Sequence, residues 1–479
     1  MKLIRILFIL AIDLTLAACS NKATIIIENV SENPELIIRY TVPTRYANPM
    51  ILMDTLSGTS ELRFRVVVRQ PYFVSVQQIP DFKGMVTFPV SRGETYRLQF
   101  DGESFSFPAP GQEVQRFYAS IPDYGHTQLE ARNYAQITDL SQARESLDST
   151  MKSQMAPFDS LLQIKKISPQ MYDLISSDRE CNTLVVWGQV GVLRRDNTIR
   201  DAIFETTDLD NDRLAESPKY YGLMEDYANW RIVKNMDKLR PRIQAGERYT
   251  LMMETYREAL TGGRLEAVCA WQWRYAAIQK QYEKELISLF EVFEQDYPNS
   301  PYLRSLRPYY QDILAYYAPK ETSADVHFME ETGDIATFKE LLSRFAGQKV
   351  YVDVWATWCG PCKAEFAFED TLHELLEKKG YKMLYLSVDE ERDAQKWKEM
   401  AAFYNLRGEH VRAGEKLTED LRELYGQNGA MAIPWNMIID DSGHIVNLRA
   451  PRPSDTEELS KALVRCNYST INFSRSRGR

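Results

Sequence analysis

The sequence has little of what marks several common protein classes. Only one long apolar run occurs, at the very start, which excludes a polytopic membrane protein. Six Cys in 479 residues are too few for a disulfide-built scaffold, and five scattered His leave little material for a metal site. Basic residues are not in excess, because 58 Lys and Arg stand against 67 Asp and Glu, a net charge of −9. We therefore expect neither a bound metal nor a nucleic-acid partner.

What remains is an ordinary globular composition, 44% hydrophobic and 26% charged, and a length typical of about three domains. Residues 1–18 form a secretory signal layout, with a basic start, an apolar stretch and small residues before the end. The tetrad Leu16-Ala17-Ala18-Cys19 resembles the lipobox of bacterial lipoproteins, which implies acylation of Cys19 and a membrane anchor. The charge of Asp13 is unfavourable within such a signal, and a plain signal peptide is the alternative. No acidic run follows Cys19, which favours an anchor facing the periplasm, in the outer or inner membrane.

Two regions without evident chemistry follow. Residues 19–120 contain short runs of alternating and β-branched residues between turn signals, which predict a β-rich module resembling a small sandwich. Residues 121–320 predict a helical region with a core rich in Tyr and Trp. There we expect a long helix from Leu265 to Tyr297, which contains no Gly or Pro, and a break at Pro157. A spacer or a docking module is the expected role.

From residue 321 to 479 strands and helices alternate, which predicts an α/β domain with helices on both faces of a sheet. Val350, Val352 and Val354 mark one strand and residues 383–388 a second. Residues 417–425 predict a helix, and residues 437–440 and 445–448 predict a hairpin. Ser454 and Glu457 form a capping-box pattern for the last helix. The whole chain is therefore expected to be multidomain α+β.

The most informative stretch is Trp358-Cys359-Gly360-Pro361-Cys362, which lies where a strand should end and a helix begin. A helix start favours anions, so the reactive thiolate form of Cys359 should be stabilised there. Pro361 costs no hydrogen bond in the first turn and holds Cys362 near Cys359.

A metal site and a structural disulfide are the competing interpretations of the Cys pair. One Cys-x-x-Cys pair supplies only two metal ligands, and no second pair lies at a suitable spacing. Stabilising disulfides rarely span two residues at a helix start. The motif therefore predicts a redox-active dithiol. Cys181, Cys269 and Cys466 are expected to be buried small side chains, although a bridge between Cys181 and Cys269 remains open.

The stretch 350–366 resembles thioredoxin-like proteins, and more narrowly thiol–disulfide oxidoreductases of the TlpA/ResA type. The plan of a lipoprotein with a β module and a helical region before the redox domain is similar to long TlpA-family proteins of Bacteroidetes-type bacteria. The resemblance implies a buried acid at Asp353, six positions before Cys359, that exchanges the proton of Cys362. It implies a second acid at Glu365, in a Cys-x-x-Cys-Lys-x-Glu pattern.

The resemblance also implies a substrate-binding surface. Ile433-Pro434 matches the cis-proline that faces the active site and offers backbone to an extended substrate. Trp358, Gly360 and Pro361 border the same site, and Trp355 should help frame it. Two positions depart from the family pattern, Ala367 and Trp435, and Trp435 leaves the substrate preference open.

These residues predict a membrane-anchored reductase of protein disulfides in the cell envelope, which uses its dithiol without a cofactor. Cys359 would attack a substrate disulfide, and Cys362 would then release the reduced product. Family analogy implies electrons from a membrane thiol reductase of the DsbD/CcdA type and disulfide-containing client proteins. The alternatives are a disulfide oxidase or isomerase, and an envelope binding lipoprotein in which residues 23–320 act and the redox domain is secondary.

Overall fold

The computed structural model describes residues 21–29, 35–41, 51–57, 61–79, 84–122, 127–318, 323–330, 334–426 and 431–465. The chain divides into two compact units, one of residues 1–275 and 284–310, the other of residues 276–283 and 311–479. Cys19 and Cys466 lie outside the described residues, so the lipidation prediction stays a prediction. Within the described ranges, no helix combines the length and the apolar character needed to cross a bilayer.

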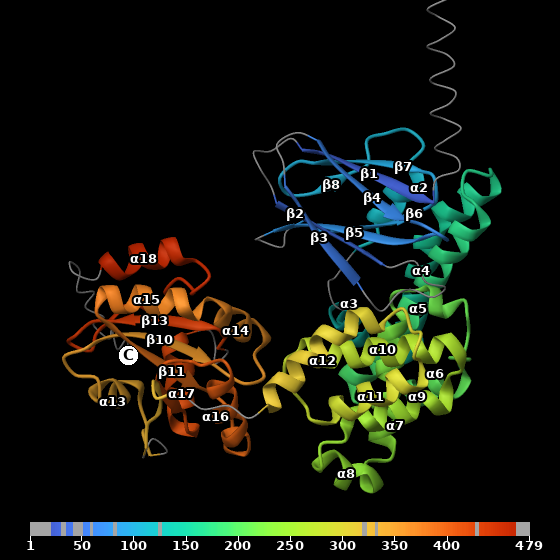
Figure 1. Ribbon diagram of the computed structural model, residues 1–479. Coiled ribbons are helices and arrows are strands. Elements are labelled where there is room, and N and C mark those ends of the chain that lie inside the picture. The colour runs from blue at the N-terminus through green and yellow to red at the C-terminus, as the bar shows by residue number, and fades with distance from the viewer. Residues whose placement is uncertain are drawn as a thin grey trace, which may run out of the picture. The chain divides into compact units, whose positions relative to one another are not determined.

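The first unit begins with two four-stranded sheets (Figure 1). Their strand orders are β4-β1-β7-β8 and β3-β2-β5-β6. One apolar cluster contains residues of both sheets, including Ile25, Leu36, Val74 and Leu98. The strands are β1 (Lys22–Asn29), β2 (Glu35–Thr41), β3 (Ile51–Ser57), β4 (Glu61–Val67), β5 (Tyr72–Ile79), β6 (Val86–Val90), β7 (Thr95–Phe100) and β8 (Phe105–Ser106).

Helices form the rest of the first unit. They are α2 (Glu113–Ala119), α3 (Thr127–Ala135), α4 (Leu140–Gln163), α5 (Pro169–Arg194), α6 (Asn197–Thr206), α7 (Tyr220–Lys234), α8 (Met236–Gln244), α9 (Arg248–Ala259), α10 (Gly262–Ile278), α11 (Glu285–Asp296) and α12 (Leu303–Tyr317), with a 3₁₀ turn η1 at Leu214–Glu216; α10 and α12 continue into the second unit.

Two expectations for the helical region were wrong. Pro157 does not break α4, because the apolar side chains before and after it, Met155, Phe158 and Leu161, are all buried on one continuous helix. The expected long helix is instead α10 and α11, separated at residues 279–284. Lys280 and Tyr282 have positive φ in this connection, which is incompatible with a continuous right-handed helix.

The second unit is built on one six-stranded sheet of order β14-β13-β10-β11-β12-β9. The neighbouring pairs β10–β11, β11–β12 and β12–β9 are parallel, and β13 is antiparallel to both β10 and β14. The strands are β9 (Val326–Phe328), β10 (Lys349–Trp355), β11 (Tyr381–Ser387), β12 (Gly408–Arg412), β13 (Trp435–Ile439) and β14 (Ile445–Asn447).

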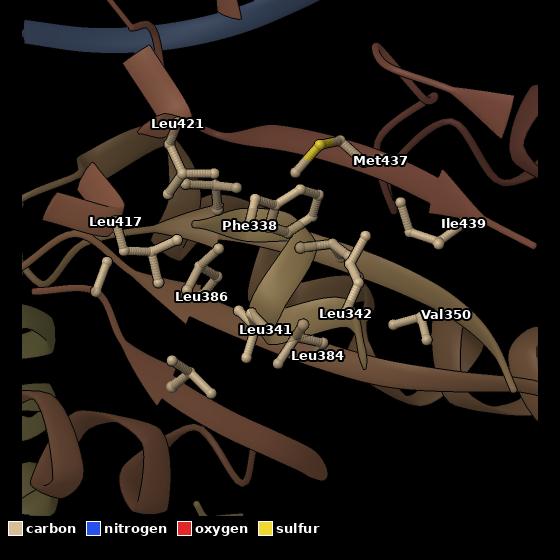
Figure 2. Packing of buried hydrophobic residues seen from close by; sticks show 14 of the residues in the cluster. Phe338, Leu341, Leu342, Val350, Leu384, Leu386, Leu417, Leu421, Met437 and Ile439 are labelled. Atoms are coloured by element: carbon tan, nitrogen blue, oxygen red, sulfur yellow. The ribbon is translucent and has the colours of Figure 1, made fainter. Parts of the chain in front are cut away.

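Helices lie on both faces of this sheet (Figure 1). They are α13 (Phe338–Ser343), α14 (Gly360–Glu365), α15 (Glu369–Lys379), α16 (Ala394–Phe403), α17 (Glu415–Tyr425) and α18 (Thr456–Arg465), with 3₁₀ turns η2 (Phe366–Phe368) and η3 (Glu391–Asp393). The main core lies between the sheet and the pair α13 and α17, where Phe338, Leu341, Leu417 and Leu421 meet β10 and β11 (Figure 2). This is the α/β arrangement predicted for the C-terminal part.

The alternation of β10 positions the site. Val350, Val352 and Val354 point into the core with α13 and α17. Since successive strand residues point to opposite faces, Asp353 and Trp355 lie on the other face, where Trp355 meets Phe366 edge to face at 5.2 Å. The chain leaves β10 at Trp355 and enters α14 five residues later, so the Cys pair lies at the carboxyl end of a central strand.

Candidate active site

Cys359 and Cys362 form a disulfide, with their Cα atoms 5.3 Å apart. Cys359 is the N-cap residue of α14, and the backbone N–H of Cys362 donates to its Sγ at 3.1 Å. Pro361 occupies the first turn of the helix, as the sequence predicts. Cys359 is 4% exposed and Cys362 is fully buried. Cys359 is therefore the more exposed residue of the pair, and Cys362 is enclosed.

Asp353 is buried on β10 with Tyr385 and Asn436 as its neighbours on the two adjacent strands. Neither of its carboxylate oxygens has a hydrogen-bond partner among the described residues. Burial first, and then the nearby Glu369 and Glu365, raise the pKa of Asp353 well above the usual carboxyl range. A carboxyl group with a raised pKa binds a proton tightly enough to exchange it with a thiol, which is the role the resemblance implies.

Glu365 is also buried, but its carboxylate has partners. The backbone N–H and the hydroxyl of Ser454 donate to it at 2.9 and 3.1 Å, and Arg452 lies 4.0 Å away. Ser454 therefore contacts α14. The expected capping box of Ser454 and Glu457 is not formed, because α18 begins only at Thr456. The bonds tie α14 to residues 452–454, and a proton-transfer role for Glu365 stays a prediction.

The bond between Ile433 and Pro434 is cis, as predicted. Pro434 immediately precedes β13, whose first residue, Trp435, pairs with Val354 near the end of β10. The proline therefore lies at the same end of the sheet as the Cys pair. Trp358 is 56% exposed beside Cys359, a position that suits contact with a large substrate.

Trp435, which the sequence suggested could affect the substrate preference, is a core residue. It is buried in the main core, where its indole meets Tyr425 edge to face at 5.1 Å. Its Nε1 donates to the carbonyl oxygen of Leu448. Trp435 is thus a packing residue beneath the site and offers no surface to a substrate.

Lys363, Thr357 and Asp389 also belong to this site, although the sequence did not single them out. Lys363 follows Cys362 directly and is 1% exposed, although a lysine is almost never fully buried without partners. Burial first, followed by the charge of Lys396, lowers its pKa to about 7. Thr357 and Asp389 are buried beside it and bonded to each other. The only signal in the sequence was a lysine within an otherwise apolar first turn.

The other described cysteines take no part in this site. Cys181 and Cys269 are buried free thiols, so no bridge joins them. Burial raises the pKa of each thiol, most strongly for Cys181, which makes both poor nucleophiles. In the described part of the chain, no group of three or more His, Cys, Asp or Glu side chains has a metal-binding arrangement.

The fold and the Cys-Gly-Pro-Cys turn together define a thioredoxin-like dithiol domain. Residues 332–463 match the family model described as Redoxin. The chain is similar to "Thiol-disulfide oxidoreductase ResA" of Bacillus thuringiensis (strain Al Hakam), with 25% identity over 113 residues, 24% of this chain and 61% of the relative. It is 32% identical to the ResA protein of Geobacillus kaustophilus (strain HTA426) over 57 residues, 12% of this chain and 33% of the relative.

The chain thus spans between one third and about three fifths of these relatives. A solved thioredoxin domain of a thiol–disulfide oxidoreductase from Bacteroides vulgatus is also similar, at 22% identity over 26% of this chain and 83% of that one, with a TM-score of 0.21. The C-terminal part of this chain is a TlpA/ResA-type thioredoxin-like domain, as the sequence predicted.

Proposed function

We propose that the protein is a membrane-anchored thiol–disulfide oxidoreductase that reduces protein disulfides in the cell envelope. The observation that carries the proposal is the Cys359–Cys362 pair at the start of α14, in which Cys359 is slightly exposed and Cys362 is fully buried. Asp353 supports it as a proton-exchanging group, because it is buried on β10 and its carboxylate has no hydrogen-bond partner in the described part of the chain. The relation of the domain to ResA proteins points to the same chemistry.

The reaction proceeds by two exchanges. The Cys359 thiolate attacks one sulfur of the client disulfide, that S–S bond breaks, and a mixed disulfide forms as the other client sulfur leaves as a thiolate. Cys362 loses its proton, with Asp353 as the acceptor, and attacks Cys359 Sγ. This displaces the second client thiolate, so the client gains two electrons and the Cys pair is left as a disulfide. Trp358 and the backbone at Ile433 border the path of the client.

A redox titration of the full chain against glutathione tests the direction of this reaction. The Cys-Gly-Pro-Cys sequence predicts a midpoint near that of thioredoxin, about −270 mV. A midpoint near about −120 mV would instead favour an oxidase or isomerase. A reducing protein needs an electron donor, for which we propose a membrane thiol reductase of the DsbD/CcdA type. Loss of the reduced form in cells that lack such a reductase would support this partner.

The anchor and the remaining domains have separate tests. We propose that acylated Cys19 attaches the chain to the periplasmic side of a membrane; a Cys19→Ser variant should then be recovered in the soluble fraction of the envelope. We further propose that the two sheets of residues 19–120 form a β-sandwich-like spacer or docking module, on the ground of their shared apolar cluster. If residues 23–320 instead act as a binding lipoprotein and the redox domain is secondary, a Cys359→Ser variant would keep the cellular role.

A further inference from the structure

Every polar group of Thr357 is bonded, and Thr357 lies two residues before Cys359. Its backbone N–H donates to both carboxylate oxygens of Asp389, at 3.1 and 2.9 Å, and its hydroxyl donates to one of them at 2.8 Å. Its carbonyl oxygen accepts from Lys363 Nζ at 2.6 Å. Thr357 is 2% exposed, so its polar groups depend on these partners. The turn that carries Cys359 is therefore held from two sides, by an acid after β11 and by a lysine on α14.

Lys363 has a second acceptor far away in the sequence. Its Nζ donates to the backbone carbonyl oxygen of Lys280 at 3.0 Å. A buried amine that loses an acceptor is left with an unsatisfied donor, which is costly whether the amine is charged or neutral. The position of Lys363, and through it that of the Thr357 carbonyl, thus depends on where residue 280 lies.

Residue 280 is fixed by its own surroundings. Tyr282 is stacked on Tyr316 with ring centroids 4.4 Å apart, and its hydroxyl and that of Tyr404 share a hydrogen bond of 2.7 Å. The neighbouring Gln281 accepts from Lys396 at 3.1 Å. The connection between α10 and α11 is in this way bonded to α16 and to the end of α12, within the same compact unit as the Cys pair.

We propose that Lys363 is a positioning residue of the dithiol site and that residues 276–283, which precede the Redoxin match at residue 332, complete that site. The segment supplies the Lys280 carbonyl, which accepts a hydrogen bond from Lys363 and so fixes the position of its amine. The same amine donates to the carbonyl of Thr357 and thereby holds the turn that ends at Cys359. A helical connection outside the thioredoxin-like fold would then tune the reactivity of the dithiol. This goes beyond the proposed function, because it holds for electron flow in either direction.

The test compares full-length Lys363→Met with Lys378→Met, a matched change at an exposed lysine of the same unit. The reduced proteins are titrated by the ultraviolet absorbance of the thiolate, reacted with an aromatic disulfide, and equilibrated with glutathione. Loss of the donor to Thr357 and of a cation one helical turn from Cys359 should raise the thiolate pKa and move the midpoint to more negative values. We expect the reaction rate at neutral pH to fall about ten-fold. Lys378→Met should match the wild type.

One further variant keeps the test informative if Lys363→Met does not fold. Tyr404→Phe removes one hydroxyl that holds Tyr282 and leaves the ring, so it should change the rate and midpoint in the same direction, by a smaller amount. Wild-type rates and midpoints in folded Lys363→Met, or in Tyr404→Phe if Lys363→Met does not fold, would overturn the inference. Failure of the wild type to react would instead overturn the proposed function.

Discussion

Replacement of Asp353 by Asn should stabilise the second unit and slow its chemistry. The carboxyl group is fully enclosed, and neither oxygen has a partner among the described residues. Burial, with the charges of Glu369 and Glu365, raises the pKa of Asp353 in the folded protein. An amide has nearly the same shape and cannot ionise, and the side chain of Asn436, opposite it on β13, could bond to it in the variant.

The direction of the pH effect follows from proton binding. Between the carboxyl pKa of the unfolded chain and the raised folded value, the folded protein holds a proton that the unfolded chain has lost. Stability in the wild type therefore falls as the pH rises through this window, with a slope that approaches ~1.4 kcal/mol per pH unit. The Asn variant lacks this loss. The gain in its free energy of unfolding over the wild type should be small at pH values near the ordinary carboxyl pKa and exceed ~1 kcal/mol at neutral pH.

Hydrogen exchange of the oxidised full chain measures the free energy of unfolding of the second unit separately from that of the first. Amides of the central strand β10 (Lys349–Trp355) exchange through unfolding of the second unit, so their protection reports its free energy. Asp370→Asn, whose carboxyl group is 95% exposed, is the control and should leave the pH profile unchanged. Parallel profiles for the wild type and Asp353→Asn would refute the assignment of a raised pKa. Release of product from the mixed disulfide should slow by roughly 10²-fold or more in the variant, since general-base catalysis supplies a factor of that order.

Four other substitutions have defined outcomes. Cys362→Ala should trap a disulfide-linked client on Cys359, detectable as a mass shift that dithiothreitol reverses. Gly408→Ala should destabilise the second unit by more than ~2 kcal/mol, because an added Cβ would lie 2.8 Å from a backbone oxygen at φ +145°. Gly347→Ala, at positive φ but in open space, should cost only ~1 kcal/mol when both variants are unfolded by denaturant. Trp435→Phe should lower stability by ~1 kcal/mol and leave the midpoint unchanged, so a shifted midpoint would contradict its role as a core residue.

The features that the sequence predicted correctly are those that local rules determine. The alternation at Val350, Val352 and Val354 identified the strand and its core face, and the Cys pair with Pro361 identified the helix start. The features it missed depend on distant partners. Nothing local shows that the carbonyl of Lys280 accepts from Lys363, 83 residues later. The positive φ of Tyr282 is likewise set by its burial against Tyr316, since packing compensates a backbone conformation that the residue itself disfavours.

Asp353 and Lys363, two of the buried ionisable groups near the dithiol, have their pKa values displaced in opposite directions. Burial raises the pKa of Asp353 from the carboxyl range and lowers that of Lys363 to about 7. Both shifts move the groups toward the range in which cysteine thiols titrate, and proton transfer is most efficient between groups of similar pKa. Burial of each group lowers the stability of the fold. The same burial shifts its pKa so that the group can exchange a proton with the thiols or stabilise their charge. Asp353→Asn and Lys363→Met remove these two contributions separately, so additive effects of the pair on the thiolate pKa would mean that the acid and the lysine act independently on the dithiol.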